Sequence, residues 1–410
     1  MNTTKRFIST GNPVYDTMFA LLRTALWGEQ RFPMLQFSPD AIDWAALYKE
    51  LRYQTVQNLP LDLLCHADPQ HKTAYMQSAV PNLKHYYQIL KEQQTVYQLL
   101  QSARIPCVIL KGTSAARYYP TPSYRCMGDV DLIVRPDDFQ RTFDLLCENG
   151  YEYDGVEDLR HIHLKHHGVL FELHRYFALL NNREQAAMLD NRIFEGLAHA
   201  QVITLDGYSF PSLPVVENGL VFLDHICQHI EGGIGLRQII DWMMYADREL
   251  NDEFWTTGFQ PIVQALGLET LAVTVTRMCQ LYLGLREDIT WCSHADESLC
   301  EELITLLMES GNWGRKRGKH VQKSIDTLIV AKNAFAFFRY LQQRGISNWA
   351  LLQRYPWLKP FAWLYQLCRY IRKGFSGEHP IRSFLCNLKK IKKTDSLLDR
   401  LEISRRSKGQ

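Results

Sequence analysis

Two aspartates that lie two residues apart, Asp129 and Asp131, form the pattern with the clearest chemistry in the sequence. They alternate with valine and leucine, and this alternation predicts a strand over 129–134 with both carboxylates on one face. Two adjacent carboxylates repel each other unless a cation lies between them, and hard oxygen ligands select Mg²⁺ or Mn²⁺. The pair therefore predicts a site for a divalent cation.

A third carboxylate, Glu172, lies in an otherwise apolar run that predicts a strand over 168–174. An ionised glutamate in a buried strand is costly without a partner. A metal ion, or a proton taken from a substrate, would account for it. His174 lies two residues further on, so it shares the face of Glu172 and could contact a substrate or orient the carboxylate.

A polar turn precedes both strands. Lys111, Gly112, Thr113 and Ser114 follow an apolar run that predicts a strand over 106–110, and a short helix over 115–119 comes next. Such a turn offers free backbone N–H groups and a hydroxyl, which suit phosphate oxygens. Taken alone, an ordinary strand-to-helix turn explains it better. Its place before the two aspartates and the third carboxylate favours a phosphate site.

Joined in this order, these features resemble the nucleotidyltransferase superfamily that includes DNA polymerase β and the aminoglycoside nucleotidyltransferases. That superfamily has a Gly-Ser-type turn, then D-x-D on the next strand and an Asp or Glu on a later one. More narrowly, L-K-G-T-S-A-A-R-Y-Y-P-T-P-S-Y-R-C-M-G-D-V-D-L-I-V and the later F-E-L-H resemble an uncharacterised bacterial nucleotidyltransferase-like family. The resemblance covers about 105–245. The chain departs from the broader pattern where Lys-Gly-Thr-Ser stands in place of the commoner Gly-Gly or Gly-Ser.

The resemblance implies a role for each matching residue. Asp129 and Asp131 would ligate Mg²⁺, and Glu172 would hold a second metal or accept the proton of the attacking hydroxyl. The reaction would be in-line attack of an acceptor hydroxyl on the α-phosphorus of an NTP, with release of pyrophosphate. The residues that would contact the nucleotide, with a cationic side chain among them as a charge clamp, are Lys111, Gly112, Thr113, Ser114, Arg125 and Gly128.

The helical stretch 220–241 is also similar to that family's helical half. His225 and His229 are four apart and share a helix face, as do Arg237 and Asp241. The histidines are interpreted first as satisfied side chains between domains and second as part of an acceptor pocket. Arg237 and Asp241 would pair with each other or serve the acceptor.

Five of the fourteen histidines fall between 161 and 174 and raise a different hypothesis. His161 and His163 would share a strand face and could ligate a transition metal. No cysteine or spaced carboxylate completes a tetrahedral set, so the sequence favours a polar hairpin edge that also contains His166 and His167.

The elements that must position these residues predict an α+β chain, with a small nucleotidyltransferase mixed β-sheet core flanked by helical N- and C-terminal domains. The predicted parts are a helical domain over 1–104, the α/β core over 105–213, a helical domain over 214–345 and an aromatic-rich, basic helical tail over 346–410. The helices expected outside the core are 14–27, 41–57, 82–103, 215–230, 235–248, 252–265, 268–284, 297–311 and 322–342.

Composition narrows the class of protein. The 410 residues are 46% hydrophobic and 22% charged with a net charge of +2, which excludes a largely disordered chain and disfavours a long nucleic-acid partner. No apolar run reaches the roughly 18 residues of a membrane span. The ten cysteines form no C-x-x-C pair and predict buried thiols in a reducing compartment, with the cytoplasm as the default location. The aromatic residues of 357–370 are expected in a core, and the basic tail at 389–408 on the surface, where it could contact an anionic surface.

The function predicted on these grounds is Mg²⁺-dependent (or Mn²⁺-dependent) transfer of a nucleotidyl group from an NTP to a hydroxyl of a small molecule, peptide or protein. The alternative is a catalytically silent nucleotide-binding or interaction protein of the same fold, such as a toxin–antitoxin or regulatory partner. A phosphotransferase is disfavoured because the sequence has neither a P-loop nor the H-R-D and D-F-G motifs of protein kinases.

Overall fold

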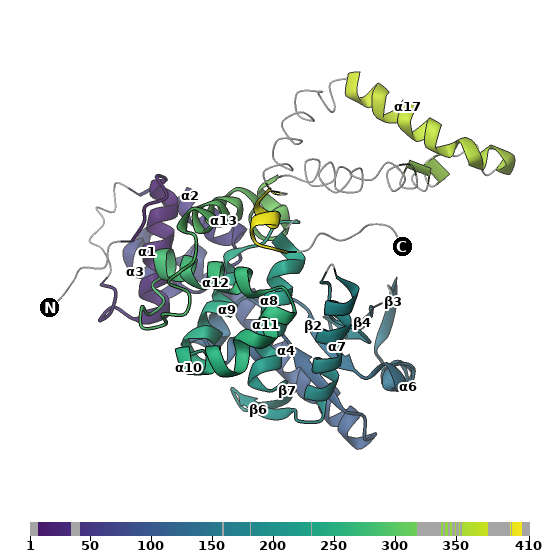
Figure 1. Ribbon diagram of the computed structural model, residues 1–410, viewed down its shortest axis with the longest axis horizontal. Coiled ribbons are helices and arrows are strands. Elements are labelled where there is room, and N and C mark those ends of the chain that lie inside the picture. The colour runs from purple at the N-terminus through teal and green to yellow at the C-terminus, as the bar shows by residue number, and fades with distance from the viewer. Residues whose placement is uncertain are drawn as a thin grey trace.

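A five-stranded mixed sheet lies among helices that come from both sides of it in the sequence (Figure 1). The computed structural model describes residues 7–33, 42–157, 160–180, 182–230, 232–317, 355–375 and 396–403, with Thr394 and a few residues between 338 and 352. Helix α17 (Ala362–Phe375) lies apart from the sheet. The expected α+β class is confirmed.

The sheet has the strand order β1-β2-β5-β4-β3. Strands β2 and β5 are parallel and all other neighbours are antiparallel, which makes the sheet mixed. The strands are β1 (Cys107–Leu110), β2 (Val130–Val134), β3 (Glu152–Glu157), β4 (His161–His166) and β5 (Val169–His174). A separate hairpin pairs β6 (Gln201–Leu205) with β7 (Tyr208–Ser212).

The register places the polar residues of the central strands in one row. Asp131 of β2 lies beside Glu172 of β5, and Glu172 lies beside His163 of β4. In the next row, His174 of β5 lies beside His161 of β4. Residues that lie opposite each other on neighbouring strands project to the same face of a sheet. One face of this sheet therefore carries two carboxylates and three imidazoles.

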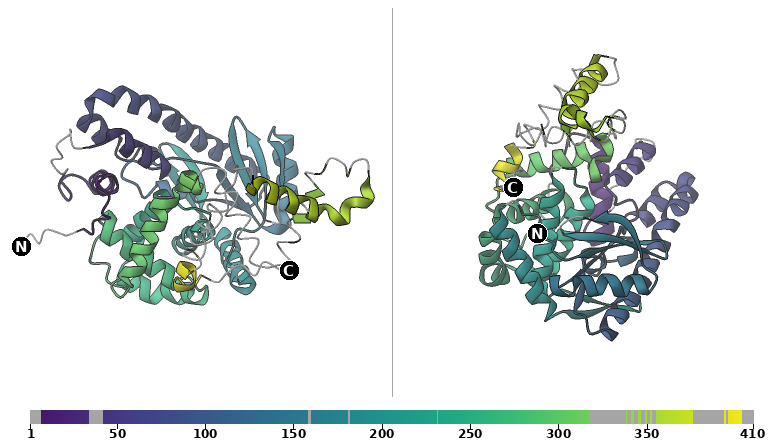
Figure 2. Two further views of the ribbon diagram at one scale, coloured as in Figure 1. Left: turned by 90° about the horizontal axis from the view of Figure 1, so that it is seen from above. Right: turned by 90° about the vertical axis from the view of Figure 1, so that its right-hand side faces the viewer.

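Alternation along the strands gives each face its own core. Val130, Leu132 and Val134 pack with α4 (Lys72–Ser102) and α6 (Pro136–Glu148), and Figure 2 shows the long α4 reaching the sheet. Ile133 belongs to a larger core, on the face of the carboxylates. That larger core also contains α8 (Val215–Ile230) and α9 (Leu236–Glu249). The carboxylates therefore lie between the sheet and the later helices.

The larger core also joins the two helical parts of the chain. It contains residues of α1 (Pro13–Trp27) and α2 (Trp44–Tyr53) together with residues of α12 (Glu269–Met278) and α13 (Glu297–Ser310). The expected domain boundaries stay a prediction from the sequence, but helices from both ends pack around one apolar interior.

Most of the expected helices are confirmed, with differences at their ends. Helix α4 begins ten residues earlier than the expected 82, since Pro81 does not interrupt it. Pro81 is exposed, so the carbonyl that loses its donor can face water. Two other expected helices contain π-helical turns: 252–265 consists of α10 (Asp252–Phe254), Trp255–Phe259 and α11 (Gln260–Ala265), and 268–284 consists of α12 and Cys279–Leu283.

Some elements were not predicted. Helix α7 (Arg183–Leu197) and strands β6 and β7 lie in a stretch where no helix or strand is expected from the sequence. The connecting elements are α3 (Leu61–Ala67), α5 (Gly112–Ala116) and the 3₁₀ turns η2 (Pro69–His71), η3 (Pro122–Tyr124), η6 (Asn312–Arg317) and η7 (Pro356–Phe361). Most of the expected helix over 322–342 and most of the basic tail lie outside the described residues.

Two expectations about the surface are wrong. The histidine-rich strand β4 is no edge, because it pairs with β5 on one side and β3 on the other. The aromatic stripe is not a closed core: Trp357 is 70% exposed and Phe361 51%. Among the described helices, none has both the length and the apolarity needed to cross a membrane.

Helices α8 and α9 approach each other closely at Gly219. This contact fixes the position of the two helices that cover the carboxylate face of the sheet. The Tyr245 hydroxyl donates to the Val215 carbonyl at 3.0 Å, so the tyrosine ring lies against the backbone of α8. A Cβ atom on Gly219 would overlap the Tyr245 ring.

We expect Gly219→Ala to lower the free energy of unfolding by about 1–3 kcal/mol through overpacking. Alanine is the better helix former by about 1 kcal/mol, so a net loss must come from the clash. Urea denaturation measures the change. Gly232→Ala is the control, because a Cβ atom there would meet nothing within 4 Å. Equal stability of Gly219→Ala and the unchanged chain would show that α8 and α9 do not touch as described.

Candidate active site

The turn after β1 has an unusual backbone that directs Lys111 toward the sheet. Lys111 has a φ of 50° and Gly112 a φ of 36°. A non-glycine residue in this region costs of order 1–3 kcal/mol, and such strain is concentrated at functional sites. Nothing lies within 4 Å of the point where a Cβ atom on Gly112 would be. The backbone at Gly112 is therefore open to a ligand.

Lys111 places a positive charge on the carboxylate row. Its Nζ lies 2.8 Å from Oδ1 of Asp131 and 5.3 Å from the centre of the Phe177 ring. Burial lowers the pKa of Lys111, but the charges of Asp131, Asp129 and Glu172 raise it by more. The lysine therefore stays cationic, and all three carboxylates act on it.

Asp131 is the most buried of the three carboxylates, with 2% of its surface exposed. Its Oδ1 also lies 3.0 Å from Nε2 of His174. Burial raises the pKa of Asp131, but the Lys111 ammonium and the His174 hydrogen bond outweigh burial and hold this pKa well below its usual range. Asp131 is thus a carboxylate that is ionised at every physiological pH.

Asp129 has the opposite environment. It directly precedes β2, at the end of the loop from η3, and is half-buried. Burial and the charge of Asp131 raise the pKa of Asp129, and Lys111 offsets only part of this. The pKa values of these two neighbouring carboxylates are thus shifted in opposite directions. Such a pair indicates that the nearby cations do not neutralise both carboxylates.

Glu172 extends the carboxylate cluster to the next strand. Its two oxygens lie 3.3 Å from Nε2 of His163 and 3.4 Å from Nε2 of His174. Burial raises the pKa of Glu172, but the His174 hydrogen bond and the Lys111 charge give a net lowering. For His174, burial lowers the pKa and hydrogen bonds to Asp131 and Glu172 raise it above the usual value.

The donor set decides which metal ions the cluster could hold. The oxygens of Asp129, Asp131 and Glu172 suit Mg²⁺ or Mn²⁺. Ligand atoms of His161, Glu172 and His174 also lie within 4.8 Å of one another, and imidazole nitrogens favour softer transition metals. The residues thus fit a divalent cation.

A second histidine cluster connects the strand of Glu172 to α4. Nδ1 of His166 lies 2.6 Å from one oxygen of the buried Glu92, and Nδ1 of His167 lies 2.9 Å from the other. His166 stacks on Tyr151 with ring centres 4.1 Å apart. These contacts anchor the β4–β5 turn and so hold Glu172 in register.

Two hydroxyls of the turn are already engaged inside the fold. Thr113 Oγ1 donates to Gln93 at 2.8 Å, and Ser114 Oγ donates to the Ile109 carbonyl at 2.8 Å. Both side chains are fully buried. Phosphate contacts of this turn would therefore come from backbone N–H groups and Lys111.

Arg125 and Asp241 form a buried ion pair between the loop before β2 and helix α9. Nε and Nη2 of Arg125 each lie 2.7 Å from an oxygen of Asp241, and the Tyr119 hydroxyl donates to the same carboxylate at 2.6 Å. Both side chains of the pair are 4% exposed. The expected pairing of Arg237 with Asp241 is replaced by this one. In the described structure, Arg237 donates to the Cys126 carbonyl at 3.0 Å, close to Gly128.

His225 and His229 lie on the helix that covers the carboxylate face, with ring centres 4.7 Å apart. Burial and the charge of Lys111 lower the pKa of both, to about 4 for His229. Both imidazoles are therefore neutral at pH 7. Because the charge of Lys111 acts on both imidazoles, His225 and His229 lie on the side of α8 that faces the site.

The structure also adds residues that the sequence did not assign to the site. His163 reaches Glu172 because β4 pairs with β5, and His161 lies beside His174 for the same reason. The sequence contains the histidines but not the pairing. Alternation within 161–166 was the available signal, and it becomes informative only when the partner strand is known.

A mixed sheet with this carboxylate row and this turn defines a nucleotidyltransferase-type core. The comparison with protein families agrees: residues 40–284, more than half of the chain, match the model described as "Uncharacterised nucleotidyltransferase". The chain belongs to this family. Membership supports a general role in nucleotidyl transfer with an NTP as substrate.

One similar solved structure is an antigenic nucleotidyltransferase-like protein from Paracoccidioides brasiliensis. It is 15% identical over 48% of this chain and 92% of that chain, with a TM-score of 0.30. At that score the likeness adds nothing to the assignment. The search of curated proteins gave no match.

We expect Asp241→Asn to lower the free energy of unfolding by about 3–5 kcal/mol, because Arg125 would be left buried without its counterion. Urea denaturation measures the loss. The double variant Arg125→Met with Asp241→Leu, which buries no charge, should recover part of it. A fully stable Asp241→Asn protein would contradict the structural role and favour an acceptor role for Asp241.

The raised pKa of His174 predicts a pH-dependent contribution to stability. This contribution is complete below about pH 6.5, the usual histidine value, and is lost as the pH rises through the folded pKa of His174. His174→Asn should therefore destabilise the protein more at pH 6 than at pH 9 in urea titrations. The exposed His199 is the control, and His199→Asn should cost little at either pH because an exposed side chain contributes little to stability. A pH-independent loss in His174→Asn would mean that folding leaves the pKa of His174 unchanged.

Proposed function

We propose that this protein transfers a nucleotidyl group from an NTP to a hydroxyl-bearing acceptor in a Mg²⁺-dependent (or Mn²⁺-dependent) reaction. The observation that carries the proposal is the carboxylate row, in which Asp131 and Glu172 are direct neighbours on parallel strands and Asp129 precedes the first of them. Family membership supports the general reaction class.

Asp129 and Asp131 are the residues that would hold the metal, and Glu172 beside them would take the proton of the acceptor. When bound, Mg²⁺ neutralises charge on the triphosphate and on the phosphorus under attack. Burial and then the charge of Asp131 raise the pKa of Asp129, and a bound cation would favour its ionised form.

The turn after β1 would bind the phosphates. The backbone at Gly112 is open, and the Lys111 ammonium lies at the edge of the carboxylate row, where it can contact a phosphate oxygen as a charge-assisted donor. Arg125 is committed to Asp241, so its contribution is to hold the loop that ends at Asp129 against α9.

Glu172 would accept the acceptor's proton. As the acceptor O–H attacks, its oxygen forms a bond to the α-phosphorus, and the bond from that phosphorus to the bridging oxygen breaks. Pyrophosphate leaves with the electron pair of that bond, and the proton passes to the Glu172 carboxylate. The lowered pKa of Glu172 keeps it ionised and able to take the proton, and His163 and His174 fix the carboxylate on either side.

The acceptor would enter from the side of α8 and α9. His225 and His229 present neutral imidazoles there, and Arg237 adds a cation near Gly128. Such a wall suits a small molecule, a peptide or a protein side chain. The net charge of +2 disfavours a long nucleic acid.

A catalytically silent nucleotide-binding or interaction protein is the second candidate. Lys111 and His174 both lie within 3.0 Å of Asp131, and these internal cations neutralise the carboxylate that a metal needs. In such a protein the pairs would persist with nucleotide bound, and no turnover would follow.

The experiment incubates the protein with Mg²⁺, acceptors from a lysate, and each NTP labelled at the α- or the γ-phosphate. Transfer of the α-label alone is expected. Asp131→Asn should reduce it at least about a hundredfold through loss of one ligand charge, and Glu172→Gln should reduce transfer more than NTP binding. Asp144→Asn, exposed on α6 over the opposite face of the sheet, is the control and should keep full activity.

Other outcomes separate the candidates. Transfer of the γ-label would mean a phosphotransferase. NTP binding without transfer of either label would favour the silent protein. Full activity of Glu172→Gln would move the third carboxylate elsewhere, with Asp154, whose Oδ2 lies 3.9 Å from Nδ1 of His163, next to test.

A further inference from the structure

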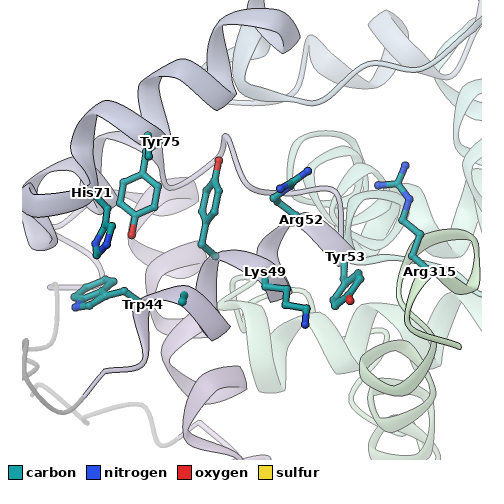
Figure 3. Close-up of a pocket in the computed structure, with 10 residues that line it drawn as sticks. Trp44, Lys49, Arg52, Tyr53, His71, Tyr75 and Arg315 are labelled. Atoms are coloured by element: carbon teal, nitrogen blue, oxygen red, sulfur yellow. The ribbon is translucent and has the colours of Figure 1, made fainter. Parts of the chain in front are cut away.

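A groove outside the carboxylate cluster lies between α2, the start of α4 and η6 (Figure 3). Its volume of about 560 Å³ is within the range of roughly 300–1,000 Å³ typical of small-molecule sites. None of its lining residues belongs to the carboxylate cluster, the turn after β1 or helices α8 and α9.

One part of the groove is aromatic. Trp44 and Tyr48 are one turn apart on α2, and Trp44 lies near Tyr75 of α4 in Figure 3. The Tyr48 and Tyr75 rings are 4.8 Å apart at 50°. The Tyr75 hydroxyl donates to the buried Asp68 at 2.5 Å, and His71 lies 2.8 Å from the same carboxylate. These contacts fix Tyr75, so the rings form a preorganised surface for stacking.

The other part of the groove is cationic. Lys49, Arg52 and Arg315 are exposed, and no hydrogen bond or ion pair joins their side chains to any other residue that the structure describes. The neighbouring Lys316 differs, because its Nζ lies 2.5 Å from Glu50. The groove therefore lacks a carboxylate to neutralise three of its cations.

The two parts are arranged in order along one helix face. Trp44, Tyr48 and Arg52 are spaced by four residues, which places the Cα atom of Arg52 about 6 Å beyond that of Tyr48 and about 12 Å beyond that of Trp44 along the axis. A ligand that matches this order has a flat ring at one end and an anionic group at the other, with a spacer between them.

We propose that this groove binds a nucleoside phosphate at a site separate from the carboxylate cluster. The base stacks on Trp44 and Tyr48, and the phosphates lie between Arg52 and Arg315, with Lys49 at the side. An aromatic side chain can stack on the face of any base. A guanidinium group can donate two parallel hydrogen bonds to phosphate oxygens. The inference depends on the groove alone and holds whether or not the carboxylate cluster is catalytic.

The test is calorimetric titration of the full chain with ATP in EDTA, so that no divalent cation connects the nucleotide to the carboxylates. We expect one ATP per chain. The double variant Arg52→Gln with Arg315→Gln should weaken binding at least about tenfold through loss of both charged partners. One variant should bind as the unchanged chain does: Arg248→Gln, which removes a matched exposed arginine on α9.

Tripolyphosphate is the second probe and isolates the ring contribution. Trp44→Ala should weaken the binding of ATP by about tenfold, which is the effect of one lost base–aromatic stack. The same variant should leave the binding of tripolyphosphate unchanged. Equal loss for both probes, or ATP binding no tighter than tripolyphosphate, would overturn the assignment to a nucleoside phosphate. Unchanged ATP binding in the double arginine variant, or an equal loss of binding in Arg248→Gln, would overturn the site itself. Circular dichroism confirms that each variant is folded.

Discussion

The arrangement depends on one constraint, the neutralisation of Asp131 inside the sheet. A carboxylate with 2% of its surface exposed must have charged or hydrogen-bonding partners. Lys111 provides one from the strained turn after β1, and His174 provides the other from β5. Both partners come from elements next to β2, so the requirement of this one charge brings the turn, the two strands and Glu172 together.

A second buried ion pair, between the loop before β2 and helix α9, completes the site. Arg125 and Asp241 connect the loop before β2 to α9 with two contacts of 2.7 Å. The pair explains why the helical half is part of the site although it supplies none of the three carboxylates. Sheet and helices are held in one geometry, and His225 of α8 faces the charges of the sheet.

The sequence predicts what is local and misses what depends on pairing. Alternation was sufficient to place Asp131 on β2 and to put Glu172 and His174 on one face of β5. It could not show that β4 lies inside the sheet, so His163 was assigned to an edge. The choice of Asp241 as the partner of Arg125, 116 residues away, depends on tertiary contacts that no spacing rule contains.

The central claim is that the carboxylates bind a divalent cation together with a nucleotide. It is tested most directly by anomalous diffraction from crystals grown with Mn²⁺ and a non-hydrolysable NTP analogue. We expect a Mn²⁺ ion roughly 2.1 Å from oxygens of Asp129 and Asp131 and of the triphosphate. Nucleotide bound without Mn²⁺, with Lys111 still paired to Asp131, would contradict it.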